Sequence, residues 1–167
     1  MNKTSIVAAL AAVLSLGAAR AEAAEAKSGM TPFIPPPPAG WSSPTPPNET
    51  EDENGMEPSV SIGYGPDKPG ERGLLYIILT HPSPHDMPSR FQSPRPLGPS
   101  PFAPQLVVSH VKVNELDAYL TYDANEQGGV LQMRVGRVLV GIQGGATTTD
   151  QIVAFARSID TARLQKY

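Results

Sequence analysis

Residues 130–143 read VLQMRVGRVLVGIQ, and this stretch decides the fold. Gly136-Arg137 separates two runs of alternating apolar and polar residues, and a two-residue loop with glycine first suits a type II′ β-turn. This loop length fixes the facing pairs, and alternation places all their side chains on one face of the sheet. The expected pairs are Val135 with Val138, Met133 with Val140, and Leu131 with Ile142. A slip by one residue would move this whole apolar set to the water side, so the register is strongly specified.

Alternating or apolar runs lie on the N-terminal side of this hairpin as well. Residues 59–64 alternate, and residues 74–80 form an apolar run that suits their antiparallel partner. Residues 106–113 predict a strand with a bend near Ser109-His110, and residues 118–123 return beside it. We therefore expect an antiparallel sheet of five to seven strands.

A helix is expected after the last strand. Residues 148–151 read Thr-Thr-Asp-Gln, which has the spacing of a capping box. Apolar residues then recur at i, i+3, i+4 and i+7, as an amphipathic helix requires: Ile152, Phe155, Ala156 and Ile159. The expected fold class is α+β, with one C-terminal helix across the apolar face of the sheet.

The first 23 residues have the order of a secretory signal peptide. Lys3 precedes the apolar run 6–16, and Ala-x-Ala sites end at Ala21 and Ala23. The run is much shorter than the ~20 residues that a spanning helix needs, and without cysteine a lipoprotein anchor is excluded. We expect cleavage after Ala23, with Ala21 as the alternative. The mature chain is then periplasmic or secreted and has no membrane anchor.

Proline divides the rest of the chain. All 19 prolines lie between Pro32 and Pro104, and four of them are consecutive at residues 35–38. Such a run favours polyproline II, and its surroundings bury too little apolar surface to offset the entropy of ordering. We expect residues 24–58 to be a largely disordered lead, except that Gly40-Trp41 docks onto the domain through the indole.

The folded domain is expected over residues 59–167. It contains a proline-rich loop at residues 81–104, where the missing N–H donors exclude a central strand. A loop of this length marks either function or disorder.

Several short motifs have a familiar arrangement. They are Gly40-Trp41, Val111-Lys112-Val113-Asn114, Ala118-Tyr119-Leu120, Gly136-Arg137-Val138-Leu139-Val140, and Ala156-Arg157-Ser158-Ile159-Asp160 with Leu164. Together they resemble small exported bacterial α+β proteins of unknown function, over about residues 40–80 and 105–167. The chain is similar, more remotely, to the one-helix sheet modules of envelope and lipoprotein-carrier proteins. The resemblance implies this fold and brings no catalytic residues. Asn114-Glu115 stands where related sequences would place Asn-Gly.

The most concentrated group of potential ligands is the segment His81, His85, Asp86 and Met87. Two imidazoles, a carboxylate and a thioether suit copper or zinc. Ligands at i and i+4 meet on a helix, however, and the intervening prolines forbid one. We therefore expect a solvated loop and no cofactor, with metal binding by these residues as the alternative.

No residues suggest catalysis. There is no cysteine and no Gly-x-Ser-x-Gly motif, and the carboxylates fall in turns or caps: Asp117, Asp123, Asp150 and Asp160. His110 is expected to be a partly buried structural residue. A net charge of -3 gives no reason to expect nucleic acid.

The leading hypothesis is an exported, non-enzymatic domain that binds an envelope protein or an apolar small molecule. A sheet with a single covering helix often leaves a cleft between the two. A further alternative is a proline-rich adaptor in which residues 32–38 dock to a partner.

Overall fold

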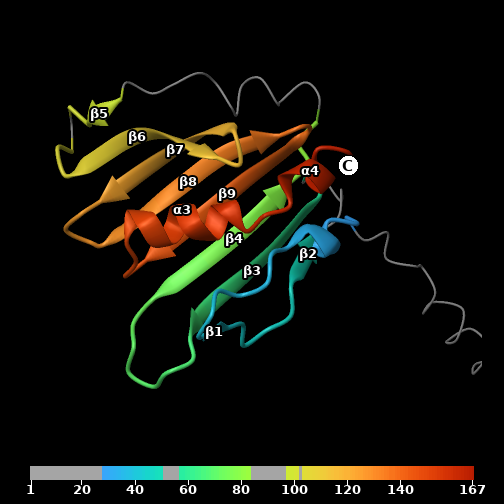
Figure 1. Ribbon diagram of the computed structural model, residues 1–167, viewed down its shortest axis with the longest axis horizontal. Helices are drawn as coiled ribbons and strands as arrows, with labels where there is room; N and C mark the ends of the chain where they lie inside the picture. The colour runs from blue at the N-terminus through green and yellow to red at the C-terminus, as the bar shows by residue number, and fades with distance from the viewer. Residues whose placement is uncertain (1–27, 51–56, 84–96, 102) are drawn as a thin grey trace, which may run out of the picture.

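The structure is a computed structural model, and it describes residues 28–50, 57–83, 97–101 and 103–167. Over these residues the chain forms a nine-stranded antiparallel sheet with helices on one face (Figure 1). The strands are β1 (Trp41–Ser42), β2 (Asn48–Thr50), β3 (Ser59–Pro66), β4 (Leu74–Thr80), β5 (Gly98–Pro99), β6 (Leu106–Val113), β7 (Leu116–Asp123), β8 (Gly128–Val135) and β9 (Val138–Gly145). The helices are the 3₁₀ turn η1 (Thr31–Phe33), α3 (Thr149–Arg157) and α4 (Thr161–Leu164). The strand order is β1-β3-β4-β9-β8-β7-β6-β5, and β2 also pairs with β3.

The expected α+β class with an antiparallel sheet and a C-terminal helix is confirmed, but the expected strand number is wrong. The three strands β1, β2 and β5 are only two or three residues long and lie in proline-rich sequence. Such short segments show no alternation, and edge positions tolerate proline, so periodicity could not reveal them. The strand expected over residues 106–113 is observed as β6, which pairs with β7 without a break from Leu106 to Val113.

The β8–β9 hairpin has the expected register. Val135 pairs with Val138, Met133 with Val140 and Leu131 with Ile142, and all six are buried. Gly136 has φ +60°, the sign that the first residue of a type II′ turn requires. A side chain there would also crowd the Gln165 carbonyl at 3.1 Å, so glycine is needed twice over.

The capping box at the start of α3 is confirmed. Gln151 N donates to Thr148 Oγ1 at 3.2 Å, and Thr148 N donates to Gln151 Oε1 at 2.8 Å. Instead of one terminal helix there are two, because α3 ends at Arg157 and Asp160 caps α4 by accepting from Arg163 N at 2.9 Å.

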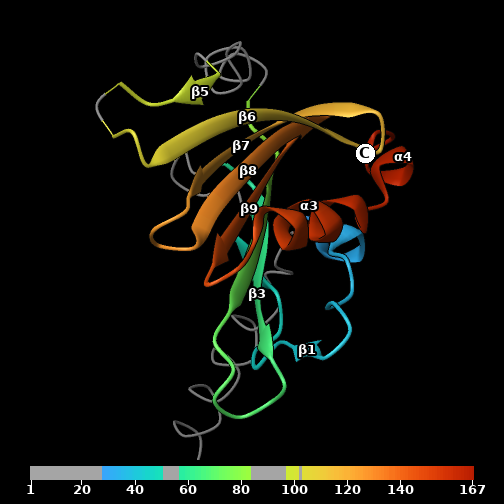
Figure 2. The same ribbon diagram turned by 60° about the vertical axis from the view of Figure 1, so that its left-hand side comes forward.

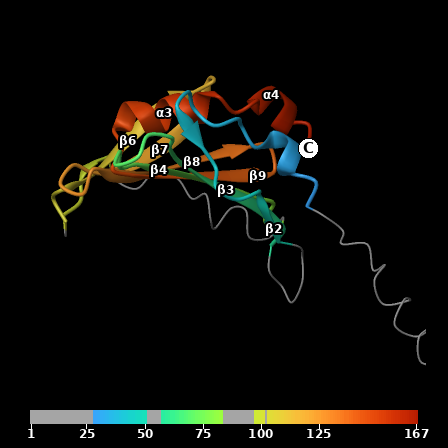
Figure 3. The ribbon, with the colours of Figure 1, turned by 90° about the horizontal axis from the view of Figure 1, so that it is seen from below.

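Helix α3 packs closely on the sheet at Gly144 of β9. A Cβ on Gly144 would lie 2.7 Å from Ile152 Cδ1, so the glycine allows this approach. Ile152, Phe155 and Ile159 are buried as expected. The helices cover one face of the sheet, and the N-terminal residues from η1 to β1 lie on the same side (Figures 2 and 3).

The largest difference from expectation concerns residues 28–41, here called the strap. We expected this part of residues 24–58 to be disordered, yet Met30 has no exposed surface and belongs to the main core. The strap is ordered because separate parts of the domain offer it partners, although its own sequence has no regular pattern.

Several expectations fall on residues outside the described segments. They are the signal peptide at residues 1–23 and, within the loop at residues 81–104, His85, Asp86 and Met87. Within the segments that are described, no helix is long and apolar enough to cross a bilayer.

Candidate functional site

The first part of the strap is held by β2. Ser28 Oγ and Thr31 N donate to Glu49 Oε1 at 3.2 and 3.3 Å, and the Thr31 hydroxyl contacts the same oxygen. These bonds flank Met30, whose side chain is fully buried. The strap is therefore held here by its own buried apolar side chain and by a carboxylate of β2 that accepts several of its donors.

The middle of the strap is held by the C-terminal residues and by β3. The Phe33 ring meets the Tyr167 ring edge-on at 5.4 Å, and the Arg163 guanidinium lies 5.1 Å from the Phe33 centroid, within cation–π range. Tyr64 Oη donates to the Pro35 carbonyl at 2.6 Å. Burial raises the pKa of Tyr64, so the phenol keeps the proton that this bond uses.

The last part of the strap turns Trp41 onto the sheet. Trp41 N donates to Pro38 O at 3.0 Å, and Gly40 has φ +79°, which is the geometry of a type II turn. A Cβ at Gly73 would lie only 2.7 Å from Trp41 Cη2, so Gly73 leaves room for the indole. The expected docking of Trp41 is thus observed: it is half-buried and packs against the core.

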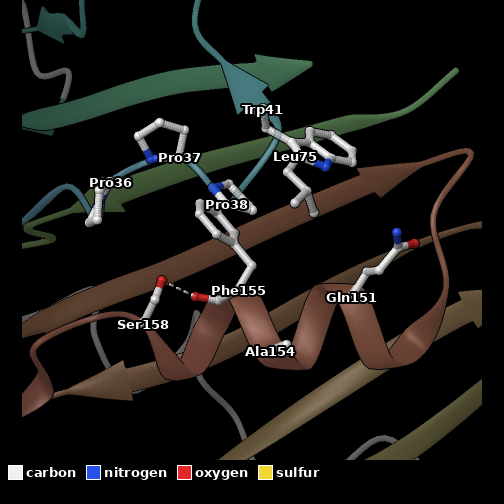
Figure 4. A pocket seen from close by; sticks show the side chains of 9 residues that line it. All are labelled: Pro36, Pro37, Pro38, Trp41, Leu75, Gln151, Ala154, Phe155 and Ser158. Atoms are coloured by element: carbon white, nitrogen blue, oxygen red, sulfur yellow. Dashed lines mark hydrogen bonds between the residues drawn. The ribbon is translucent and has the colours of Figure 1, made fainter. Parts of the chain in front are cut away.

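Between the strap and α3 lies an apolar groove of about 320 Å³ (Figure 4). The strap forms one wall, α3 forms the other, and β4 contributes to the floor. The lining residues are Pro36, Pro37, Pro38, Trp41, Leu75, Gln151, Ala154, Phe155 and Ser158.

The groove lining is almost entirely hydrocarbon. The Phe155 ring is braced edge-on by Tyr64 at 5.5 Å, and that same tyrosine holds the strap at Pro35. At one end, the Ser158 hydroxyl donates to Phe155 O at 2.6 Å. Among the described residues that line the groove, none is charged. Its chemistry is therefore suited to holding an apolar body.

A second hollow, of about 380 Å³, lies on the opposite face of the sheet. Its lining is mixed, with Ile78 and Leu139 beside Thr80 and Gln132. The two polar side chains interrupt the apolar surface, so this hollow resembles an ordinary solvated sheet face more than a ligand pocket.

The expected metal segment is not assembled by the described residues. The His81 ring packs edge-on against Tyr167 at 5.8 Å, and its backbone N–H donates to Pro58 O at 2.9 Å. Its three proposed partners lie outside the described residues. Across the described ranges, no group of three or more potential ligands occurs. Metal binding by this loop stays an untested prediction.

Three of the four carboxylates named from the sequence, Asp117, Asp123 and Asp160, accept hydrogen bonds from neighbouring residues. Asp123 Oδ1 accepts from Asn125 N at 2.8 Å within a turn, and Asp150 lies in the first turn of α3. Asp117 Oδ1 accepts from His110 Nε2 at 2.7 Å and from Lys112 Nζ at 2.8 Å. The bonds from Lys112 and His110 hold the pKa of Asp117 below its usual value.

His110 differs from its expected position. We predicted a partly buried residue, but His110 is exposed. Because β6 pairs with β7 without a break, alternation turns residue 110 to the face away from the helices, beside Tyr119, whose ring lies 5.5 Å away.

Only one wall of the groove was predictable from the sequence. The apolar stripe of α3 and the docking of Trp41 were both expected, but the proline wall was not. The usable signal was a run of rigid prolines that ends three residues before Trp41, the only tryptophan in the chain.

Comparison of the chain with known protein families, with curated proteins and with solved structures gives no match. The resemblance to small exported bacterial proteins therefore stays a prediction, and the function has to be argued from the groove.

Proposed function

We propose that this chain is an exported, non-enzymatic domain that binds an apolar small molecule in the groove between the strap and α3. The observation that carries the proposal is the groove itself, with its apolar lining and its volume of about 320 Å³. This volume lies at the lower end of the roughly 300–1,000 Å³ that is usual for ligand pockets.

The walls of the groove favour binding because they are already rigid. Proline has a fixed φ, so Pro36, Pro37 and Pro38 lose little conformational freedom when a ligand covers them. The Phe155 ring is buried and braced by Tyr64. A ligand that covers the open apolar surface gains about 25 cal/mol for each Å² removed from water.

Export is supported by the order of residues 1–23, which suits a signal peptide. N-terminal sequencing of the exported protein should begin at Ala24. An intact Met1 held in the membrane would show that the apolar run is an anchor and that this part of the proposal is wrong.

Trp41 provides a direct test of binding, because it is the only tryptophan in the chain and lines the groove. Titration of the mature protein with the uncharged probe N-phenyl-1-naphthylamine should give saturable probe fluorescence and quenching of Trp41. The absence of saturable binding would contradict the proposal.

Two matched substitutions locate the site. Ala154 is exposed and lines the groove, so Ala154→Phe should fill it and abolish probe binding. Ala162 is also exposed, on α4, and does not line the groove, so the Ala162→Phe variant should bind the probe normally. Equal probe affinity in the two variants would place the binding elsewhere. Probe binding that survives Ala154→Phe would equally contradict the groove as the site.

A further inference from the structure

We infer that the ligand of the groove carries an uncharged carbonyl group, as in a ketone, ester or amide, beside Trp41 and Gln151. This inference rests on the proposed function and adds the chemical class of the ligand. Its starting point is that these two side chains present hydrogen-bond donors at the same end of an otherwise apolar groove (Figure 4).

The orientation of the Gln151 amide is set by the capping box. Its Oε1 accepts from Thr148 N at 2.8 Å, so the amide oxygen is engaged with the start of α3. The amide NH₂ is therefore turned away from the cap. Figure 4 shows it on the side of the amide that faces Trp41.

The indole supplies the second donor. Tryptophan Nε1–H can only donate, and Figure 4 shows this nitrogen on the side of the ring that faces α3. Within the described residues, neither the indole N–H nor the Gln151 NH₂ has an acceptor. A pure hydrocarbon would displace the water around these donors without replacing its hydrogen bonds, which is unfavourable.

Charge selects the kind of acceptor. No lysine, arginine or histidine is among the described residues that line the groove, so a carboxylate would find no cation there. The charged residue in the first turn of α3 is Asp150, next to Gln151, and it would repel an anion. An uncharged carbonyl oxygen can accept a hydrogen bond at this end of the groove without this repulsion.

The volume sets a lower bound on the size of ligand that the groove can hold. A groove of about 320 Å³ has room for about ten water molecules at about 30 Å³ each, and so for at least about ten non-hydrogen atoms. Nonan-2-one, octanoate and butylbenzene all have about this size. They carry an uncharged carbonyl, a carboxylate and no acceptor, respectively.

The experiment is displacement of N-phenyl-1-naphthylamine from the full mature chain by these three compounds. Nonan-2-one should displace the probe at the lowest concentration, about tenfold below butylbenzene, as expected for about one hydrogen bond. Octanoate should be weaker than nonan-2-one. If octanoate is the strongest, the acceptor is anionic and the inference is wrong.

Substitution of Gln151 tests its NH₂ donor separately from its role in capping α3. Gln151→Glu keeps an oxygen for Thr148 N, as in a capping box, but removes the NH₂ donor. Nonan-2-one should then bind about tenfold more weakly, while butylbenzene is unchanged. Gln151→Met should give the same selective loss without adding a charge.

Different outcomes of these experiments would contradict the carbonyl group of the ligand and the binding groove itself. If all three compounds bind equally and both Gln151 variants leave them unchanged, the carbonyl inference fails but an apolar groove stands. If neither the probe nor any of the compounds binds, both fail.

Discussion

The β8–β9 hairpin and the strap are two parts of one core, and their structures are specified in opposite ways. In the hairpin, alternation and a two-residue turn determine every facing pair, from Val135 with Val138 outward. In the strap, no local pattern exists, and Met30 is nevertheless as fully buried as Met133 of the hairpin.

The partners explain this difference. Hairpin pairs are close in sequence, whereas the strap binds Glu49, Tyr64 and Tyr167, which are 18 to 139 residues away from their contacts. A segment can thus be ordered by a few single contacts to a surface that the rest of the chain has built. Composition alone argues against order in such a segment, because it counts only the apolar surface that the segment itself supplies.

The largest expected effect is at the centre of the hairpin. Val140→Asp should unfold the domain, with a loss of about 4 kcal/mol or more, because it places an unpaired charge in the core. Val130→Asp is the matched control, since Val130 is 40% exposed on β8 and should change stability by only about 0.5 kcal/mol. Chemical denaturation followed by circular dichroism measures both. Equal losses would show that the register is wrong.

The next effect tests the strap. Met30→Ala should cost about 2–5 kcal/mol, the usual range for a buried methionine. Leu97 is also a large apolar residue outside the predicted strands, but it is 58% exposed, so Leu97→Ala should cost about 0.5 kcal/mol or less. If residues 28–41 are a disordered lead, the two substitutions will have the same small effect on unfolding.

A smaller effect is expected where β3 holds the strap. Tyr64→Phe removes the hydroxyl that donates to Pro35 O and leaves that carbonyl unpaired, at a cost of about 1–3 kcal/mol. Tyr76→Phe is the control, because Tyr76 lies on the same sheet with its side chain on the other face. The hypothesis predicts weaker probe binding in Tyr64→Phe and unchanged binding in Tyr76→Phe. No difference between the two would remove Tyr64 as a strap contact.

The smallest effect is at the exposed carboxylate of β7. The bonds from Lys112 and His110 lower the pKa of Asp117 in the folded state, so their stabilisation is present above its unfolded pKa and is lost as the pH falls through the folded one. Asp117→Asn should therefore lower the denaturation midpoint slightly at neutral pH and have no effect in strong acid. A difference that persists at low pH would point to a cause other than this charge.

The parts that the sequence predicted are those in which neighbours in sequence determine the structure. The strands β3, β4 and β6–β9 show alternating or apolar runs, and Thr148 with Gln151 caps α3 as expected. The strand β1 and the proline wall could not be predicted in this way, because each depends on surfaces formed elsewhere, such as the space above Gly73 that receives Trp41. Of the two walls of the groove, helix α3 could be predicted from the sequence and the strap could not.

The strap has to be part of the folded domain if it is to form a wall of the groove. The direct measurement compares residues 24–167 with residues 40–167, both of which retain Trp41, by chemical denaturation and by titration with N-phenyl-1-naphthylamine. We predict that the shorter chain loses at least the about 2–5 kcal/mol expected for Met30 alone, or fails to fold, and no longer binds the probe. An unchanged denaturation midpoint together with unchanged probe affinity would show that the strap is neither part of the folded domain nor a wall of the binding site.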